Sequence, residues 1–138
     1  MTTISWTDLK VGDTLPERNA GPISRTVLAL FAGGSGDHNP IHVDIDFARK
    51  FGFDDVFAHG MLSMAYLAQM LTGWTSRDRL RGYSVRFASI TPVHAKVVCT
   101  GQVARLFEED GEPRAQLILQ ASVDGTVTLQ GEAIVALT

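Results

Sequence analysis

The C-terminal half of the chain alternates apolar and polar residues in a way that predicts β-strands. The pattern begins at residues 83–88, where Tyr83, Val85 and Phe87 alternate with Ser84, Arg86 and Ala88. The same period of two returns twice, and its apolar positions are Leu117, Leu119, Ala121, Val123, Val127, Leu129, Ala133 and Val135. A period of two turns one face of each strand toward a core. We therefore expect strands that are each buried on one face.

Turn residues separate these strands. Asp124-Gly125 predicts a tight hairpin, and Asp110-Gly111 predicts a second, longer turn. Residues 96–102 are expected to form a further strand, and turn residues between positions 8 and 22 frame a short first strand near 14–20. Together these signals predict an antiparallel sheet of about five strands.

The segment 60–72 predicts a helix of a different kind. It contains no proline and has almost no polar face before Gly73. A helix that is apolar all round is a buried helix, so in a small domain something must surround it. We expect the sheet to curl around this helix, which gives an α+β fold in a single domain spanning residues 1–138.

Two shorter helices are expected before the buried one. Ser24 offers an N-cap for a helix that the glycine-rich run 33–36 then stops. Asp44 or Asp46 could cap a second helix that runs through Phe51 and ends at Gly52. The residues between the two helices, through Pro40, are expected to form a loop.

Composition and charge narrow the classes of partner. The chain has 138 residues, of which 45% are hydrophobic and 20% charged, as is ordinary for a globular domain. Its net charge is −3 and its 12 basic residues form no run, so we expect neither nucleic acid nor an anionic membrane as a partner. The longest apolar stretch, 61–71, is shorter than the roughly 20 residues that a membrane crossing needs.

The compartment is suggested by two weaker signals. Cys99 is the single cysteine, which cannot form an internal disulfide and suits a reducing environment. The first eight residues show no basic start and no apolar run, so no signal peptide is expected. These observations favour the cytoplasm.

The segment 36–42 carries the residue types for acid–base chemistry. Asp37 and His42 flank Asn39-Pro40, a dipeptide that favours a turn. A bend there could bring a carboxylate and an imidazole to one small molecule, where they could hold a water and move its protons. The same residues are also good turn formers, so a purely structural role remains open. A metal site built from Asp37, His38, His42 and His59 is disfavoured because no metal-binding spacing organises them.

The start of the expected buried helix is a second candidate. A helix N-terminus presents unpaired N–H groups that suit a developing oxyanion, and Gly60 lets a ligand approach the backbone closely. The alternative is that Gly60 only eases entry into the helix. His59 is expected to be a hydrogen-bonded core histidine.

Other chemically interesting residues favour structural roles. The methionines at 61, 64 and 70 are expected to fill the core. His94 is expected in an exposed turn, and Arg77, Arg79 and Arg81 on a solvated connection. No phosphate-binding loop or dinucleotide fingerprint is present.

Two blocks of sequence resemble a known family. They are Ser-Gly-Asp-His-Asn-Pro-Ile-His at 35–42 and Ala-His-Gly-Met-Leu at 58–62, with Phe47-Ala48 between them. Their order and separation are similar to the signature of MaoC-like (R)-specific enoyl-CoA hydratases and the related (3R)-hydroxyacyl-ACP dehydratases. The resemblance extends over nearly the whole chain and implies a hotdog fold, in which a curved antiparallel sheet wraps one long helix.

The resemblance also implies roles for individual residues. Asp37 and His42 match the catalytic pair that grips the reacting water, and Gly60 matches the backbone donor to the thioester carbonyl. Ser35 and Asn39 match positions that shape the catalytic loop, while His38 occupies a variable position. No cofactor and no metal are implied.

The resemblance further implies a thioester substrate and an oligomer. The substrate would be an acyl-CoA or an acyl-carrier-protein (ACP) thioester bound at a subunit interface, in a homodimer or, as in some relatives, a heterodimer. Acyl length, the carrier and the acid and base assignments stay open. Two alternatives also stay open, a hotdog thioesterase and a non-catalytic subunit of a heteromeric dehydratase.

Overall fold

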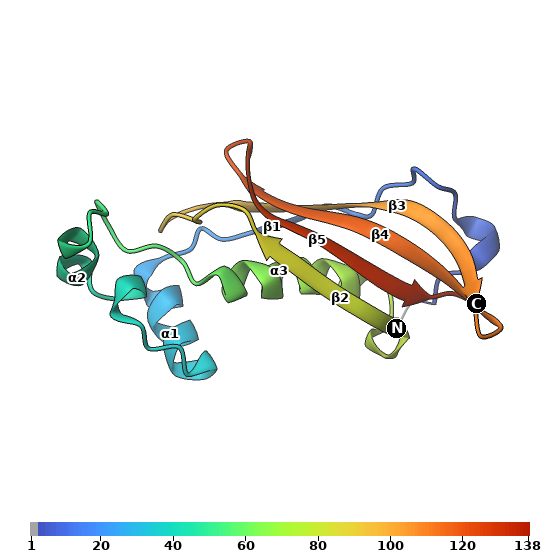
Figure 1. Ribbon diagram of the computed structural model, residues 1–138, viewed down its shortest axis with the longest axis horizontal. Helices are drawn as coiled ribbons and strands as arrows, with labels where there is room; N and C mark the ends of the chain where they lie inside the picture. Colours follow the sequence, from blue (N-terminus) through green and yellow to red (C-terminus); the bar gives the residue numbers. More distant parts are fainter. Residues whose placement is uncertain (1–2) are drawn as a thin grey trace.

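A five-stranded antiparallel sheet forms one layer of the molecule, and helix α3 lies against it (Figure 1). The structure, a computed structural model, describes residues 3–138, so residues 1 and 2, where the expected domain begins, lie outside it. The strands are β1 (Arg18–Ala20), β2 (Leu80–Phe87), β3 (Val97–Glu109), β4 (Glu112–Val123) and β5 (Thr126–Ala136), in the order β1-β3-β4-β5-β2. Every pairing is antiparallel, which confirms the predicted sheet.

Two tight hairpins connect the three longest strands. Asp124-Gly125 joins β4 to β5 with φ angles of 49° and 81°, as the sequence predicts. Asp110-Gly111, with φ angles of 53° and 76°, joins β3 to β4 and is equally short, because Glu109 already pairs with Glu112. The prediction of a longer turn there was wrong. The last residues of β3, Glu108 and Glu109, are exposed and polar, so the sequence pattern gave no sign that the strand continues this far.

The predicted alternation is confirmed in β4 and interrupted in β5. Leu117, Leu119 and Ala121 of β4 are almost completely buried. In β5, however, Thr128 is buried and Val127 only partly so, the reverse of the prediction. A register shift beside Ala121 inserts one extra residue into β5, and the Thr128 hydroxyl donates to the Ala121 carbonyl at 3.2 Å. A bulge of this kind changes which face the following residues occupy.

Helix α3 (Gly60–Trp74) packs along one face of the sheet (Figure 1). Gly101 of β3 permits the close approach, because a Cβ there would lie 3.1 Å from the Met70 side chain. The Tyr83 hydroxyl of β2 also donates to the Met64 carbonyl at 2.7 Å. Met70 of this helix is buried in the core, as predicted, but Met61 at its start is 54% exposed, so the prediction that Met61 fills the core was wrong.

Two shorter helices precede α3 and lie together at one end of the molecule (Figure 1). Helix α1 (Arg25–Ser35) is capped by Ser24, as predicted, and continues through the first two glycines of the glycine-rich run before Gly36 ends it with φ 79°. Helix α2 (Ile45–Lys50) is capped by Asp44, whose carboxylate accepts two backbone N–H groups.

The remaining segments are short. Strand β1 is shorter than the expected 14–20, since Thr14 forms only an isolated bridge with Gln102. The 3-10 segments are η1 (Trp6–Asp8), η2 (Pro40–His42) and η3 (Arg77–Arg79). Cys99 is buried in β3 and His94 is exposed, as predicted. Within residues 3–138, no helix combines the length and the hydropathy needed to cross a membrane.

Candidate active site

Asp37 lies just after the end of α1, and hydrogen bonds to nearby residues fix its position. The left-handed conformation of Gly36 turns the chain sharply away from the helix. Ser35 Oγ then accepts the Asp37 backbone N–H at 3.1 Å, and Asp37 Oδ1 accepts the Asn39 N–H at 3.2 Å. These local bonds hold the carboxylate at the tip of a loop, where its side chain is 48% exposed.

The chain reverses at Asn39-Pro40, as its sequence predicts. Asn39 caps η2 by accepting the Ile41 N–H at 3.1 Å on its side-chain oxygen, and its backbone carbonyl accepts the His42 N–H at 3.1 Å. The reversal brings His42 Nε2 to 3.8 Å from Asp37 Oδ2. The expected meeting of a carboxylate and an imidazole is therefore present in the structure.

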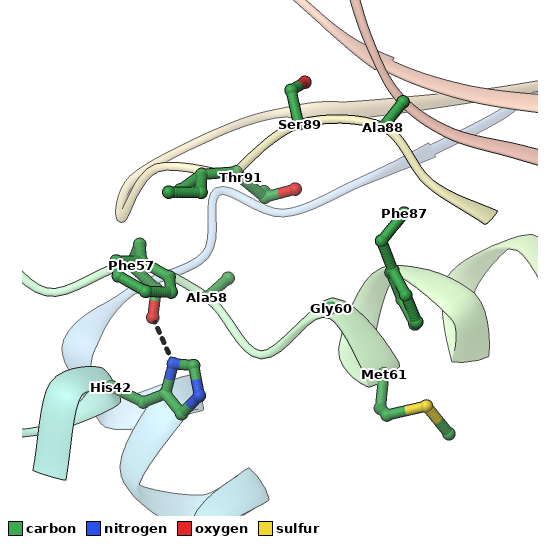
Figure 2. Close-up of a pocket in the computed structure, with 10 residues that line it drawn as sticks. His42, Phe57, Ala58, Gly60, Met61, Phe87, Ala88, Ser89 and Thr91 are labelled. Atoms are coloured by element: carbon green, nitrogen blue, oxygen red, sulfur yellow. Dashed lines mark hydrogen bonds between the residues drawn. The ribbon is translucent and has the colours of Figure 1, made fainter. Parts of the chain in front are cut away.

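The protonation pattern of neutral His42 follows from one hydrogen bond. Its Nδ1 lies 2.8 Å from the Phe57 carbonyl oxygen, which can only accept, so Nδ1 carries the hydrogen (Figure 2). The Nε2 lone pair is then free on the side of Asp37. The 3.8 Å gap is too long for a direct hydrogen bond, yet one water could lie within about 2.8 Å of both acceptors.

Gly60 and His42 line the same cavity (Figure 2). Gly60 is the first residue of α3, so its N–H has no acceptor within the helix. The cavity has a volume of about 420 Å³, and most of its lining is apolar, with Phe57, Met61 and Phe87 as its largest side chains. The imidazole of His42 and the backbone of Gly60 thus line an apolar space, and the Asp37 carboxylate lies 3.8 Å from that imidazole.

Phe87 is a site residue that sequence reasoning missed. The alternating pattern placed it on the inner face of a strand, but it is the last residue of β2, is 53% exposed, and lies against Gly60 (Figure 2). A Cβ at Gly60 would come within 2.7 Å of the Phe87 ring. The sequence signal was its place at the end of the run, where the strand leaves the sheet. Leu67 and Leu71 of α3 are buried in the core and do not line this cavity.

His59 is a hydrogen-bonded core histidine, as predicted, and it contacts both members of the pair. It is 1% exposed, and its Nε2 donates to the Asp37 carbonyl at 3.1 Å. Its ring stacks on that of His42 with centroids 3.9 Å apart and an angle of 27°. Burial lowers the pKa of His59, and the nearby His42 acts in the same direction, so the ring is neutral at physiological pH.

The same three residues also bring possible metal ligands together. One ligand atom each of Asp37, His42 and His59 lie within 4.8 Å of one another, while His38 is not part of the group. The two imidazole planes are nearly parallel, however, so their in-plane lone pairs run side by side and do not converge on one point. That geometry fits a tetrahedral ion poorly.

Comparisons with known proteins agree on the family. The family model described as "MaoC like domain" matches residues 8–119. The chain is 32% identical to an (R)-specific enoyl-CoA hydratase of Rhodospirillum rubrum, over 84% of this chain and 81% of that protein. It is also 36% identical to 3-hydroxyacyl-thioester dehydratase X of Mycobacterium tuberculosis, over 79% of this chain but only 37% of the length of that relative.

Solved structures agree on the fold. The R-hydratase PhaJ1 of Pseudomonas aeruginosa superimposes with a TM-score of 0.84 at 27% identity, and the match covers 98% of this chain and 86% of that one. The curved sheet around one helix is therefore the hotdog fold, as the sequence predicts. With a family model matched over most of its length and relatives above 30% identity, the chain belongs to the MaoC-like domain family.

Proposed function

We propose that residues 1–138 form a single hydro-lyase domain that adds water to trans-2-enoyl thioesters and gives (3R)-3-hydroxyacyl thioesters, and that also catalyses the reverse dehydration. The observation that carries this proposal is the 3.8 Å gap between Asp37 Oδ2 and His42 Nε2 at the edge of the cavity that Gly60 lines. The activity named for the R. rubrum relative supports it.

The reacting water would lie in that gap. With Asp37 ionised and the His42 Nε2 unprotonated, both facing atoms are acceptors, so each takes one of the two hydrogens of the water. The oxygen lone pair is then directed away from both groups and toward carbon 3 of the substrate. As the new C–O bond forms, one proton moves to the pair, and the pair delivers a proton to carbon 2.

The Gly60 N–H would bind the thioester carbonyl oxygen. Attack at carbon 3 pushes electrons toward that oxygen, and a backbone donor at a helix N-terminus stabilises the resulting enolate charge. Ser35 and Asn39 would support the reaction indirectly by holding the Asp37 loop. The chain's own residues suffice for these steps, so the proposal includes no cofactor.

A spectrophotometric assay tests this function. Crotonyl- to dodecenoyl-CoA are incubated with the protein, and loss of enoyl absorbance is followed by chiral analysis of the product. We expect hydration to the (3R) alcohol, with one range of chain lengths preferred, and parallel assays with acyl-carrier-protein thioesters identify the carrier. A (3S) product, or no loss of absorbance with any substrate, would contradict the proposal.

The same samples separate hydration from thioester hydrolysis. A thioesterase releases a free thiol, which a thiol reagent detects, whereas a hydratase leaves the thioester whole. The protein itself should add little background, because Cys99 is buried and burial raises its pKa to about 11. A reduced thiol of this kind also fits the cytoplasm, where we place the reaction.

A dimer is the assembly we propose. Strand β2 pairs with β5 on one side only, so in the described chain its other edge carries backbone groups free to pair with a second sheet. Light scattering should give twice the chain mass. Turnover by the chain alone would support a homodimer, and turnover only with a partner would indicate a heteromeric dehydratase.

A further inference from the structure

His59 joins the two halves of the proposed catalytic pair although it belongs to neither loop that carries them. It immediately precedes Gly60 and caps α3 without a side-chain bond to that helix. Its Nε2–H is instead directed to the Asp37 carbonyl, 3.1 Å away. The ring at the start of α3 thus reaches back to the loop after α1.

The Asp37 peptide is consequently held from two sides. Its N–H is bound by Ser35 Oγ at the end of α1, two positions away in the chain, and its carbonyl by His59 at the start of α3. Only the second bond ties the loop to a segment distant in the chain, the start of α3. Without it, the local bonds would preserve the shape of the loop but not its position opposite His42.

The His59 N–H holds Asp37, and the flat face of the same ring packs against the His42 ring. The rings of His42 and His59 stack with their centroids 3.9 Å apart. The Phe31 ring of α1 also contacts the His59 ring, in an edge-on arrangement with centroids 4.8 Å apart. On its own side, His42 donates to the Phe57 carbonyl and contacts the Phe57 ring. The imidazole is therefore enclosed, and a shift of the His59 ring would move it.

We propose that His59 is a positioning residue that sets the distance between the Asp37 carboxylate and the His42 imidazole, using its N–H for the first and its ring face for the second. This inference rests on the hydratase proposed above. It assigns His59 no contact with the substrate and no proton transfer.

The alternative, that His59 only fills the core, is disfavoured by its second nitrogen. His59 Nδ1 is buried and has no hydrogen-bond partner among the described residues. Burying an unsatisfied polar atom is unfavourable, so a purely apolar ring would fill the space better. The ionisable side chains next to the ring are those of Asp37 and His42, and a proton on Nδ1 would place positive charge beside His42 with no acceptor.

Three substitutions separate the two properties. His59→Phe keeps a ring face and removes the donor, His59→Gln keeps an amide donor and removes the ring, and His59→Ala removes both. We expect His59→Phe to fold at least as stably as the wild type and yet to lower kcat about 10-fold or more with KM little changed, because small displacements of reacting groups are costly. His59→Gln should retain more activity than His59→Ala, and His38→Ala, an exposed neighbour, should behave as wild type.

Wild-type kcat in folded His59→Phe would overturn the proposal, as would equal kcat in His59→Gln and His59→Ala. A crystal structure of His59→Phe, or of His59→Gln where the first does not fold, gives a readout independent of activity. The separation of Asp37 Oδ2 and His42 Nε2 should depart from 3.8 Å by more than about 0.5 Å, and an unchanged gap counts against His59. If the wild type hydrates no enoyl thioester, the proposed function fails while this structural test still decides the role of His59.

Discussion

The β3–β4 hairpin and helix α1 lie at opposite ends of the molecule (Figure 1). Near each of them an acidic side chain faces one or more basic groups, but in contrasting ways. Near the β3–β4 hairpin, the Glu112 carboxylate forms a closed cluster with two guanidinium groups. Its Oε2 lies 2.9 Å from Arg81 Nη2, and its Oε1 lies 2.8 Å from Arg114 Nε. Near α1, Asp37 and His42 face each other across 3.8 Å without a direct hydrogen bond. The first arrangement is satisfied by its own members, while the second leaves room for a third molecule.

The difference lies in what fixes each group. Glu112 lies on a strand and contacts two other strand residues directly, Arg81 and Arg114. Ion pairs of this kind near the surface each contribute little stability. Asp37 and His42 are oriented by bonds to the backbone, from Asn39 N–H and to the Phe57 carbonyl. Because their positions do not depend on mutual contact, the gap can persist without collapsing into an ion pair.

The largest expected effect comes from removing one side of the open pair. Asp37→Asn and His42→Ala should each lower kcat at least ~100-fold, since a positioned acid or base is typically worth 10²–10⁴-fold. Steady-state kinetics with crotonyl-CoA measures the loss, and thermal melting checks that the fold is intact.

Glu112→Gln is the matched control at the closed end. It removes a charge with two partners, but it lies far from the cavity and should leave kcat unchanged. Near-wild-type turnover by a folded Asp37→Asn or His42→Ala protein would refute the proposed roles, and a large loss in Glu112→Gln would break the contrast between the two ends.

The sequence predicted the parts of the fold that depend on neighbouring residues. The Asp124-Gly125 turn, the Ser24 cap and the buried face of β4 each follow from a local pattern. The bulge that buries Thr128 could not be predicted, because it depends on how β5 aligns with β4. The glycine-rich run 33–36 ends α1, as predicted, but the helix continues to Ser35 and only Gly36 adopts the left-handed conformation that ends it.

The candidate site divides in the same way. The meeting of Asp37 and His42 follows from a bend within six residues, so the sequence could anticipate it. The contact of Phe87 with Gly60 and the bond from His59 to the Asp37 carbonyl join segments that are distant in the chain. No period or turn signal encodes such contacts, because they arise only when the sheet and helices have packed.

A smaller effect is expected at Gly60, which sharpens the contrast without removing a charged group. In Gly60→Ala the new methyl group would lie 2.7 Å from the Phe87 ring, which is too close, so the ring must move. Because Phe87 lines the cavity, this movement changes the shape of the cavity. We expect kcat/KM to fall roughly 10-fold, because the substrate is displaced from the N–H donor. Adding Phe87→Ala should restore part of the loss.

Gly73→Ala is the control on the same helix. A Cβ there would meet nothing within 4 Å, so the substitution should raise the free energy of unfolding by about 0.5–1 kcal/mol and leave kinetics unchanged. If Gly60→Ala behaves like Gly73→Ala, the backbone at the start of α3 does not take part in substrate binding.

The smallest effect is expected at the closed end and concerns stability in acid. Arg81 and Arg114 lower the pKa of Glu112 from 4.5 to about 2, so the folded state favours the ionised carboxylate. The stability gained from this is fully present above pH 4.5 and is lost as the pH falls toward 2. The melting temperatures of wild type and Glu112→Gln should therefore differ at pH 7, differ less at pH 3 and converge as the pH approaches 2, by a modest amount because the pair is solvent-screened. Glu108→Gln, on an exposed carboxylate with no ion pair among residues 3–138, should show no such convergence. A constant difference for Glu112→Gln would mean that the closed cluster contributes through packing and not through charge, and the two ends of the molecule would then differ in kind as well as in geometry.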